Sequence, residues 1–150
     1  ASKTTRKKGS RIKLFLGLAV AAVLFAALTM PKDLPAIPQE AIDRTIEEIK
    51  ADSLVRDAAV IVDKGRVILS VVVNRSTSAD YGKQLGDRFA RRLASNASFW
   101  SDDERLKGAL TLDYLGPLWD HYDLQIIVAF DPDNVLVQGA KVRTARGITW

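Results

Sequence analysis

The sequence predicts an α+β fold in which one N-terminal transmembrane helix precedes a small domain of helix-hairpin-helix-hairpin order with an antiparallel sheet. Three observations lead to this prediction. Residues 14–30 carry no charge, two later stretches show the apolar periodicity of helices, and paired runs rich in β-branched residues follow each of them. The predicted organisation is a basic tail at 1–13, a transmembrane helix at 14–31, a proline-rich linker at 32–37 and an α+β domain at 38–150.

The uncharged segment at 14–30 has the length and the flanks of a membrane anchor. As a helix it is roughly 25 Å long, at the short end of a bilayer span, and Pro31 then stops it. The flank before it holds six basic residues and no acidic one: Lys3, Arg6, Lys7, Lys8, Arg11 and Lys13. Because positive flanks stay in the cytoplasm, we expect a bacterial inner-membrane protein with a cytoplasmic N-terminus and a periplasmic domain.

Two other interpretations of this segment fit the sequence less well. A buried core helix would show a polar face, and this segment has none. A cleavable signal peptide also begins with basic residues, but no Ala-x-Ala site closes the segment, so we expect an uncleaved anchor. Small residues spaced four apart favour packing against a partner helix in the membrane. They are Gly17, Ala21, Ala22 and Ala26.

Composition excludes several classes of function. The chain has 150 residues, a net charge of +4 and a pI near 9.5, but residues 1–31 supply the excess and the other 119 residues carry a net charge of −2. The domain therefore gives no reason to expect a nucleic-acid partner. With no cysteine and one histidine, disulfides, thiolate metal sites and multi-histidine sites are excluded.

The first half of the domain reads as a helix followed by a hairpin. Pro38 suits a first helical turn, and the isoleucines at 42, 46 and 49 form one apolar stripe through about residue 52. Two β-branched runs follow within 55–74, and Gly65 lies in the turn between them.

The second half repeats this order less clearly. A helix is predicted from 78 or 79 to about 94, where Gly82 and Gly86 favour close approach to the sheet. A capping box at Ser101 indicates a short helix. Strands at 121–130 and 135–142 then flank a turn at 131–134. Arg88, Arg91 and Arg92 form either an ordinary solvated helix face or an anion contact.

No catalytic, cofactor or small-molecule substrate site is predicted. His121 lies between Asp120 and Asp123, but in a strand residue 120 points away from the other two. The acidic run at 102–104 fits a helix N-terminus and lacks the alternation of an EF-hand loop.

Aromatic side chains gather between residues 99 and 122, and another ends the chain. They either cap the core under a long connection or form an interface with a subunit or the bilayer. The candidate interface residues are Phe99, Trp100, Tyr114, Trp119 and Trp150.

The stretch at 43–93 resembles a BON domain, a small α/β module of bacterial envelope proteins. The resemblance rests on a helix, then Val-Ile-Val-Asp at 60–63, then Gly65-x-Val67-x-Leu69, then a second helix. It implies binding to phospholipid or to a partner protein, with no catalysis.

These observations predict a non-catalytic, single-pass accessory subunit of a larger inner-membrane complex, of photosynthetic, respiratory or secretion type. Its partners would be membrane lipids and other membrane subunits. The alternative is a free-standing envelope module that binds phospholipid or a periplasmic partner through the arginines.

Overall fold

The computed structural model describes residues 33–150, which form an α+β domain. Its helices are α2 (Gln39–Lys50), α3 (Ala79–Trp100) and α4 (Leu118–His121), with a 3₁₀ turn η1 (Glu104–Leu106). Its strands are β1 (Val55–Asp63), β2 (Arg66–Val73), β3 (Asp123–Asp131) and β4 (Asn134–Lys141). The predicted tail, transmembrane helix and small-residue pairs lie outside the described residues. Within 33–150, none of the helices combines the length and the apolar character that crossing a bilayer requires.

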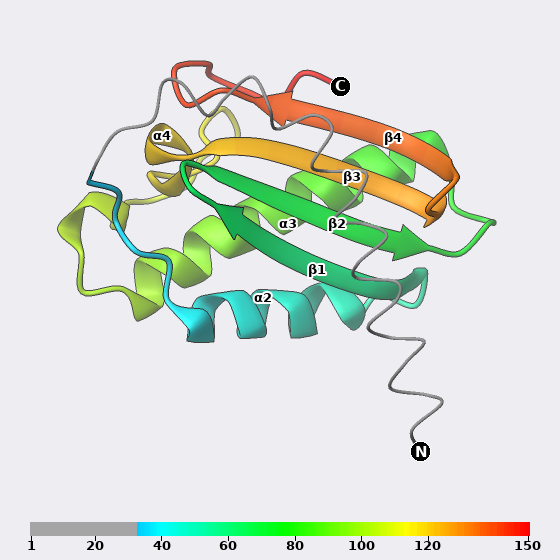
Figure 1. Cartoon of the computed structure of the whole chain (residues 1–150), viewed down its shortest axis with the longest axis horizontal. Coiled ribbons are helices and arrows are strands. Elements are labelled where there is room, and N and C mark those ends of the chain that lie inside the picture. The colour runs from blue at the N-terminus through cyan, green and yellow to red at the C-terminus, as the bar shows by residue number, and fades with distance from the viewer. Residues whose placement is uncertain (1–32) are drawn as a thin grey trace.

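The four strands form one mixed sheet in the order β1-β2-β3-β4 (Figure 1). The two hairpins are antiparallel, but β2 and β3 run parallel, so the predicted antiparallel sheet is wrong for its central pair. The reason is the connection between them. Helix α3 carries the chain back along the sheet to the end where β2 began, and a strand that starts there must run parallel to β2.

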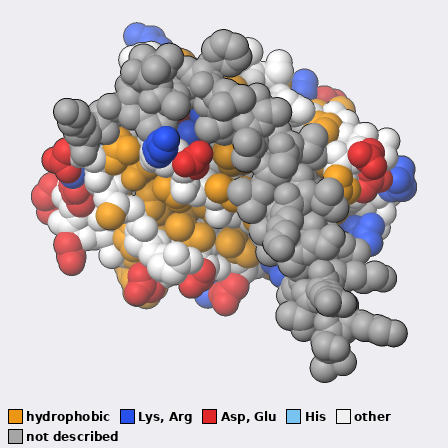
Figure 2. Space-filling model, in the orientation of Figure 1, with side chains coloured by type: hydrophobic (Ala, Val, Ile, Leu, Met, Phe, Trp, Pro, Cys, Tyr) orange, Lys and Arg blue, Asp and Glu red, His pale blue; other side chains and the backbone are white. Residues whose placement is uncertain are grey.

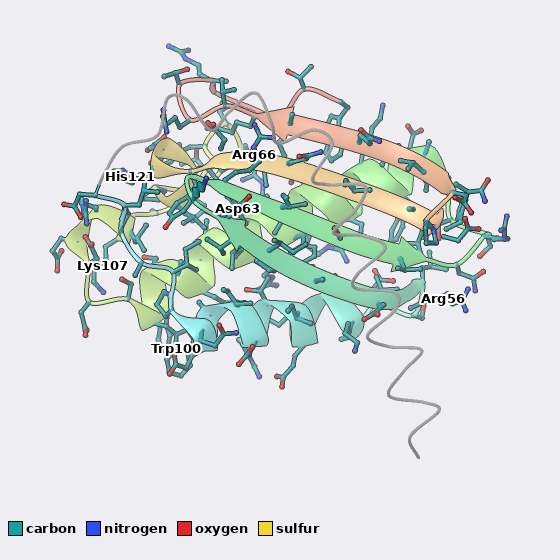
Figure 3. All side chains as sticks on the ribbon, viewed as in Figure 1. Arg56, Asp63, Arg66, Trp100, Lys107 and His121 are labelled. Atoms are coloured by element: carbon teal, nitrogen blue, oxygen red, sulfur yellow. The ribbon has the colours of Figure 1, made fainter. Side chains whose placement is uncertain are left out.

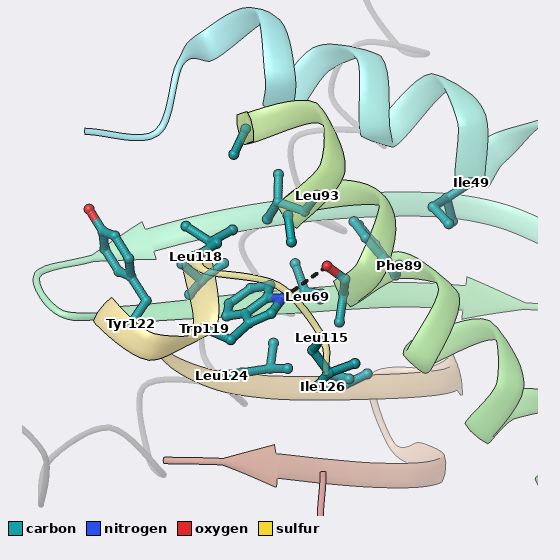
Figure 4. Packing of buried hydrophobic residues seen from close by; sticks show 14 of the residues in the cluster. Ile49, Leu69, Phe89, Leu93, Leu115, Leu118, Trp119, Tyr122, Leu124 and Ile126 are labelled. Carbon is teal, nitrogen blue, oxygen red and sulfur yellow. Dashed lines mark hydrogen bonds between the residues drawn. The ribbon is translucent and has the colours of Figure 1, made fainter. Parts of the chain in front are cut away.

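All described helices lie on one face of the sheet, and the main core lies between the two layers (Figures 1 and 4). Alternate residues of β2, namely Val67, Leu69 and Val71, point into this core. Trp119 of α4 is fully buried there, and its indole N–H donates to the Ala90 carbonyl at 3.0 Å. The buried ring thereby satisfies its polar atom.

Helix α3 begins as predicted and runs six residues further than expected. The Ser78 hydroxyl accepts a hydrogen bond from the Tyr81 N–H at 3.1 Å and caps the N-terminus. The buried stripe passes beyond residue 94 to Ala97, and no glycine or proline interrupts it. The predicted close approach is confirmed, because a Cβ on Gly86 would lie 2.9 Å from Cγ2 of Ile126.

The connection between α3 and β3 differs in detail from the prediction. Asp103 rather than Ser101 caps the short turn, because its carboxylate accepts from the Arg105 N–H at 3.0 Å. His121 ends helix α4, and the strand predicted from 121 begins instead at Asp123. Pro117, with its φ of −60°, starts that helix.

The described part of the predicted linker is packed onto the domain. Leu34 and Ile37 join the edge of the core, and the buried Pro35 accepts a hydrogen bond at its carbonyl from the Tyr122 hydroxyl at 2.8 Å. One guanidinium nitrogen of Arg105 donates to the Asp33 carbonyl at 3.2 Å. Residues 33–38 therefore form a strap across the α4 end of the domain, and we call them the strap below.

Candidate interaction surfaces

The structure separates the predicted aromatic interface into core and surface residues. Trp119 is not a surface residue, because it is 0% exposed beneath α3. Tyr114 is half-buried, and its hydroxyl donates to the Asp120 carboxylate at 2.5 Å. Burial first, and then the neighbouring Asp120, raise the pKa of Tyr114 to about 12. Neither residue offers a free ring to a partner.

Trp150 packs against the domain in a niche made by two glycines. A Cβ on Gly86 of α3 or on Gly139 of β4 would lie 2.7 Å from the indole ring. Beside it, Thr149 and Ala140 exchange backbone hydrogen bonds of 2.8 and 2.9 Å along the edge of β4. These contacts cover part of the sheet edge, but Trp150 remains 39% exposed, so its outside contact stays a prediction.

Phe99 and Trp100 do lie on the surface, as the last two residues of α3. They are 76% and 48% exposed, and their rings meet edge to face with centroids 5.2 Å apart. The pair lies at the end of the molecule that also holds Lys107 and His121 (Figure 3).

The segment that follows this aromatic pair bonds to the strap at one residue and to α3 at another. Arg105 binds the carbonyl of Asp33, as described above. Two residues further on, the Lys107 ammonium donates to the Ser98 carbonyl at 3.3 Å, next to Phe99. The aromatic pair and the start of the described chain therefore share one end of the domain.

The three arginines of α3 are each engaged within the domain. Their shortest contacts to a carboxylate are 3.1 Å for Arg88 to Asp52, 2.8 Å for Arg91 to Asp87 and 3.6 Å for Arg92 to Glu48. Arg91 also donates to the Thr111 and Leu112 carbonyls at 2.5 and 2.8 Å. The predicted anion contact would have to compete with these partners.

Asp52 is held by two side chains of α3. It accepts hydrogen bonds from the Tyr81 hydroxyl and from Arg88. Burial opposes its ionisation, but the hydrogen bonds from Tyr81, the Leu54 N–H and Arg88 outweigh burial and lower the pKa of Asp52. These contacts fasten the turn after α2 to the start of α3.

The face of the sheet opposite the helices carries a second, smaller hydrophobic cluster. Its members are Ile68, Val72, Ile127 and Ala129, with Ile61 packed against them. No described helix lies on this side, and hydrophobic side chains gather over the strands there (Figures 1 and 2). Between them, the Ser70 hydroxyl makes no hydrogen bond within residues 33–150. We call this surface the helix-free face.

Polar groups border the helix-free face at both ends of the strands. At the strap end, Arg66 donates to the Gln125 side chain at 3.5 Å, beside a hollow that Gln138 also lines. At the far end, Arg75 and Asp131 form an ion pair of 2.6 Å. The face therefore has the apolar centre and polar rim that are typical of protein interfaces.

The candidates for chemistry do not converge. Asp120 accepts from Tyr114, and Asp123 accepts from the Arg143 N–H at 2.8 Å, so neither is turned toward His121. Residues 33–150 contain no cluster of three His, Cys, Asp or Glu residues that could hold a metal ion.

Sequence analysis missed a buried cation, Lys141. It is 4% exposed, its ammonium donates to the Trp119 carbonyl at 2.8 Å, and burial lowers the pKa of Lys141. The alternation of residues in a strand could have predicted this burial, because Lys141 lies on the same core-facing side of β4 as Val137 and Gly139.

Comparisons with family models, with curated proteins and with solved structures each found no match to this chain.

Proposed function

We propose that this protein is a non-catalytic accessory subunit, anchored by residues 14–31 in a bacterial inner membrane, whose periplasmic domain binds another subunit of a larger complex. The anchor and its orientation follow from the basic tail and the uncharged segment. The partner is a protein that meets the helix-free face.

The observation that carries this proposal is the helix-free face itself. Four strands 4.8 Å apart and about eight residues long span roughly 19 by 26 Å, or about 500 Å². A face of this extent is comparable with one side of a small protein interface. Its central side chains, Ile68, Val72, Ile127 and Ala129, are no more than 8% exposed, so the support for an interaction site is their apolar character and the lack of a described helix above them.

The strap supports a partner within the same membrane. Because residues 33–38 are bonded to the domain, the domain follows the anchor closely and stays near the bilayer. Strands β2 and β3 begin at the strap end and run away from it (Figure 1). The helix-free face then points sideways, where a neighbouring membrane subunit can reach it.

Extraction of the full chain from native membranes in mild detergent, followed by native gel separation, tests the proposal. We expect a stable complex much larger than 16.5 kDa. Ile61→Glu places a charge on the helix-free face and should release the chain from that complex.

Val62→Glu is the matched control, because this neighbouring residue is on the other side of the same strand and is 43% exposed. It should leave the complex intact. A lone 16.5 kDa species from the unmodified chain, or equal behaviour of the two variants, would contradict the proposal.

A further inference from the structure

The strap fixes how far the domain can stand from the anchor on which the proposed function rests. The uncharged segment ends at Met30, and three more residues reach Asp33. A fully extended chain covers at most about 3.6 Å per residue, so Asp33 lies within roughly 11 Å of the hydrocarbon boundary. The headgroup layer on each side is itself about 5 to 8 Å thick.

The aromatic pair is at this same end of the domain. Arg105 binds Asp33, and Lys107 binds the carbonyl of Ser98, which directly precedes Phe99. Trp100 lies at the same end of the domain as Lys107 (Figure 3), and Phe99 packs against Trp100, so the short tether brings this end of the domain toward the headgroups.

The chemistry of these side chains fits the edge of a bilayer. Phe99 is 76% exposed, which is costly in water and favourable among acyl chains. The ring of Trp100 is half exposed, and its N–H donates no hydrogen bond within the described part of the chain, so it can bind headgroup oxygens. The exposed Lys107 has a long apolar stem and a charged end that suits the same depth.

We infer that Phe99, Trp100 and Lys107 form a lipid-contacting surface, in which the two aromatic rings enter the interfacial layer of the bilayer that holds the anchor. The domain is then fixed to the membrane at two points, the anchor and this surface. Two points of attachment restrict its tilt and set the direction of the helix-free face.

The chain supplies its own reference residues for a test by fluorescence. Trp119 is fully buried, and Trp150 contacts Gly86, fourteen residues before Trp100 in α3. That separation corresponds to about 21 Å along the helix. Quenching by lipid should therefore affect Trp100 and spare the other two.

The experiment uses the full chain in vesicles of phosphatidylethanolamine and phosphatidylglycerol, with and without phosphatidylcholine brominated near the top of its acyl chains. The signal of each tryptophan is the difference between the unmodified chain and the variant Trp100→Phe or Trp150→Phe. We expect brominated lipid to lower the Trp100 signal at least about twofold and to leave the Trp150 signal unchanged.

Resistance to alkaline extraction, measured on the same vesicles, separates the two proposals. An inserted chain whose Trp100 signal is not quenched overturns the lipid contact and leaves the proposed anchor standing. A chain that is washed off the vesicles overturns both. Quenching of Trp150 equal to that of Trp100 also overturns the lipid contact, because it shows no preferred end of the domain.

Discussion

The two faces of the sheet arise from the same alternation of residues and differ in what covers them. On β2, Leu69 contacts the helix layer, while its neighbour Ile68 belongs to the cluster on the helix-free face. The covered side packs against large helix side chains such as Phe89 and Trp119, and the other side holds isoleucine, valine, alanine and a serine. One strand sequence thus encodes both a core and a surface suited to a partner.

This difference teaches where stability and binding reside. Large rings and branched chains packed between two layers supply most of the hydrophobic free energy of folding. The helix-free face carries a smaller cluster that is separate from this core, so substitutions there should leave the core packing in place. Substitutions on the two faces should therefore have different effects. One pair of substitutions tests this division, and two further substitutions test the helix layer.

The largest expected effect comes from truncation on the covered side. Leu69→Ala leaves a cavity in the core and should lower the free energy of unfolding by about 2 to 5 kcal/mol. Ile68→Ala, one residue away, should lower it by less, because Ile68 is also buried but belongs to the smaller cluster. Urea denaturation of the detergent-solubilised chain, followed by circular dichroism, measures both. Equal losses would mean that both faces are needed for folding.

A smaller effect is expected where α3 comes closest to the sheet. Gly86→Ala gains helix propensity, but its Cβ would lie 2.7 Å from Trp150 and 2.9 Å from Ile126. We expect a net loss of about 1 to 2 kcal/mol and a red-shifted Trp150 emission as the indole leaves its niche. Gly147→Ala is the control, because nothing lies within 4 Å of its added Cβ. A Gly86 variant as stable as the control would show that Trp150 and Ile126 can move away from the added Cβ without loss of stability.

The smallest effect is a pH dependence within the helix layer. The pKa of Asp52 is lowered below 3.8, so its contribution to stability is complete above about pH 5 and is lost as the pH falls through its folded pKa. Asp52→Asn should cost about 1 kcal/mol at neutral pH and flatten the acid side of the stability profile. Thermal unfolding between pH 3 and 7 measures this. A variant that keeps the full acid slope would assign that slope to other carboxylates.

Local signals in the sequence predicted most of the elements. Pro38, Ser78 and Gly65 mark helix starts and a turn, and the structure has α2, α3 and the first hairpin there. The buried stripe of α2 is nevertheless centred on Ala41, Thr45 and Ile49 rather than on three isoleucines. Helical periodicity gives a direction for a face, and packing decides which neighbours fill it.

Long-range arrangement was harder to predict. The parallel pairing of β2 with β3 depends on the direction in which α3 crosses the sheet. The residues of the two strands do not by themselves predict that direction. The same holds for Trp150, which reaches its niche because Gly86 and Gly139 come together across two elements. The sequence places the aromatic candidates at 99–122 close together along the chain, but only tertiary structure separates the buried Trp119 from the exposed Trp100.

The hydrogen bond between Tyr122 and the Pro35 carbonyl has a consequence for how the two parts of the proposed protein turn together. The strap is bonded to the domain at both Asp33 and Pro35. The domain and the proposed anchor therefore have little freedom to rotate independently of each other. Rotation of the anchor about its axis then becomes rotation of the domain. One residue added to that helix would turn everything after it by about 100° and point the helix-free face toward a different neighbour. The number of residues in the proposed anchor would therefore set the direction in which the helix-free face meets its partner.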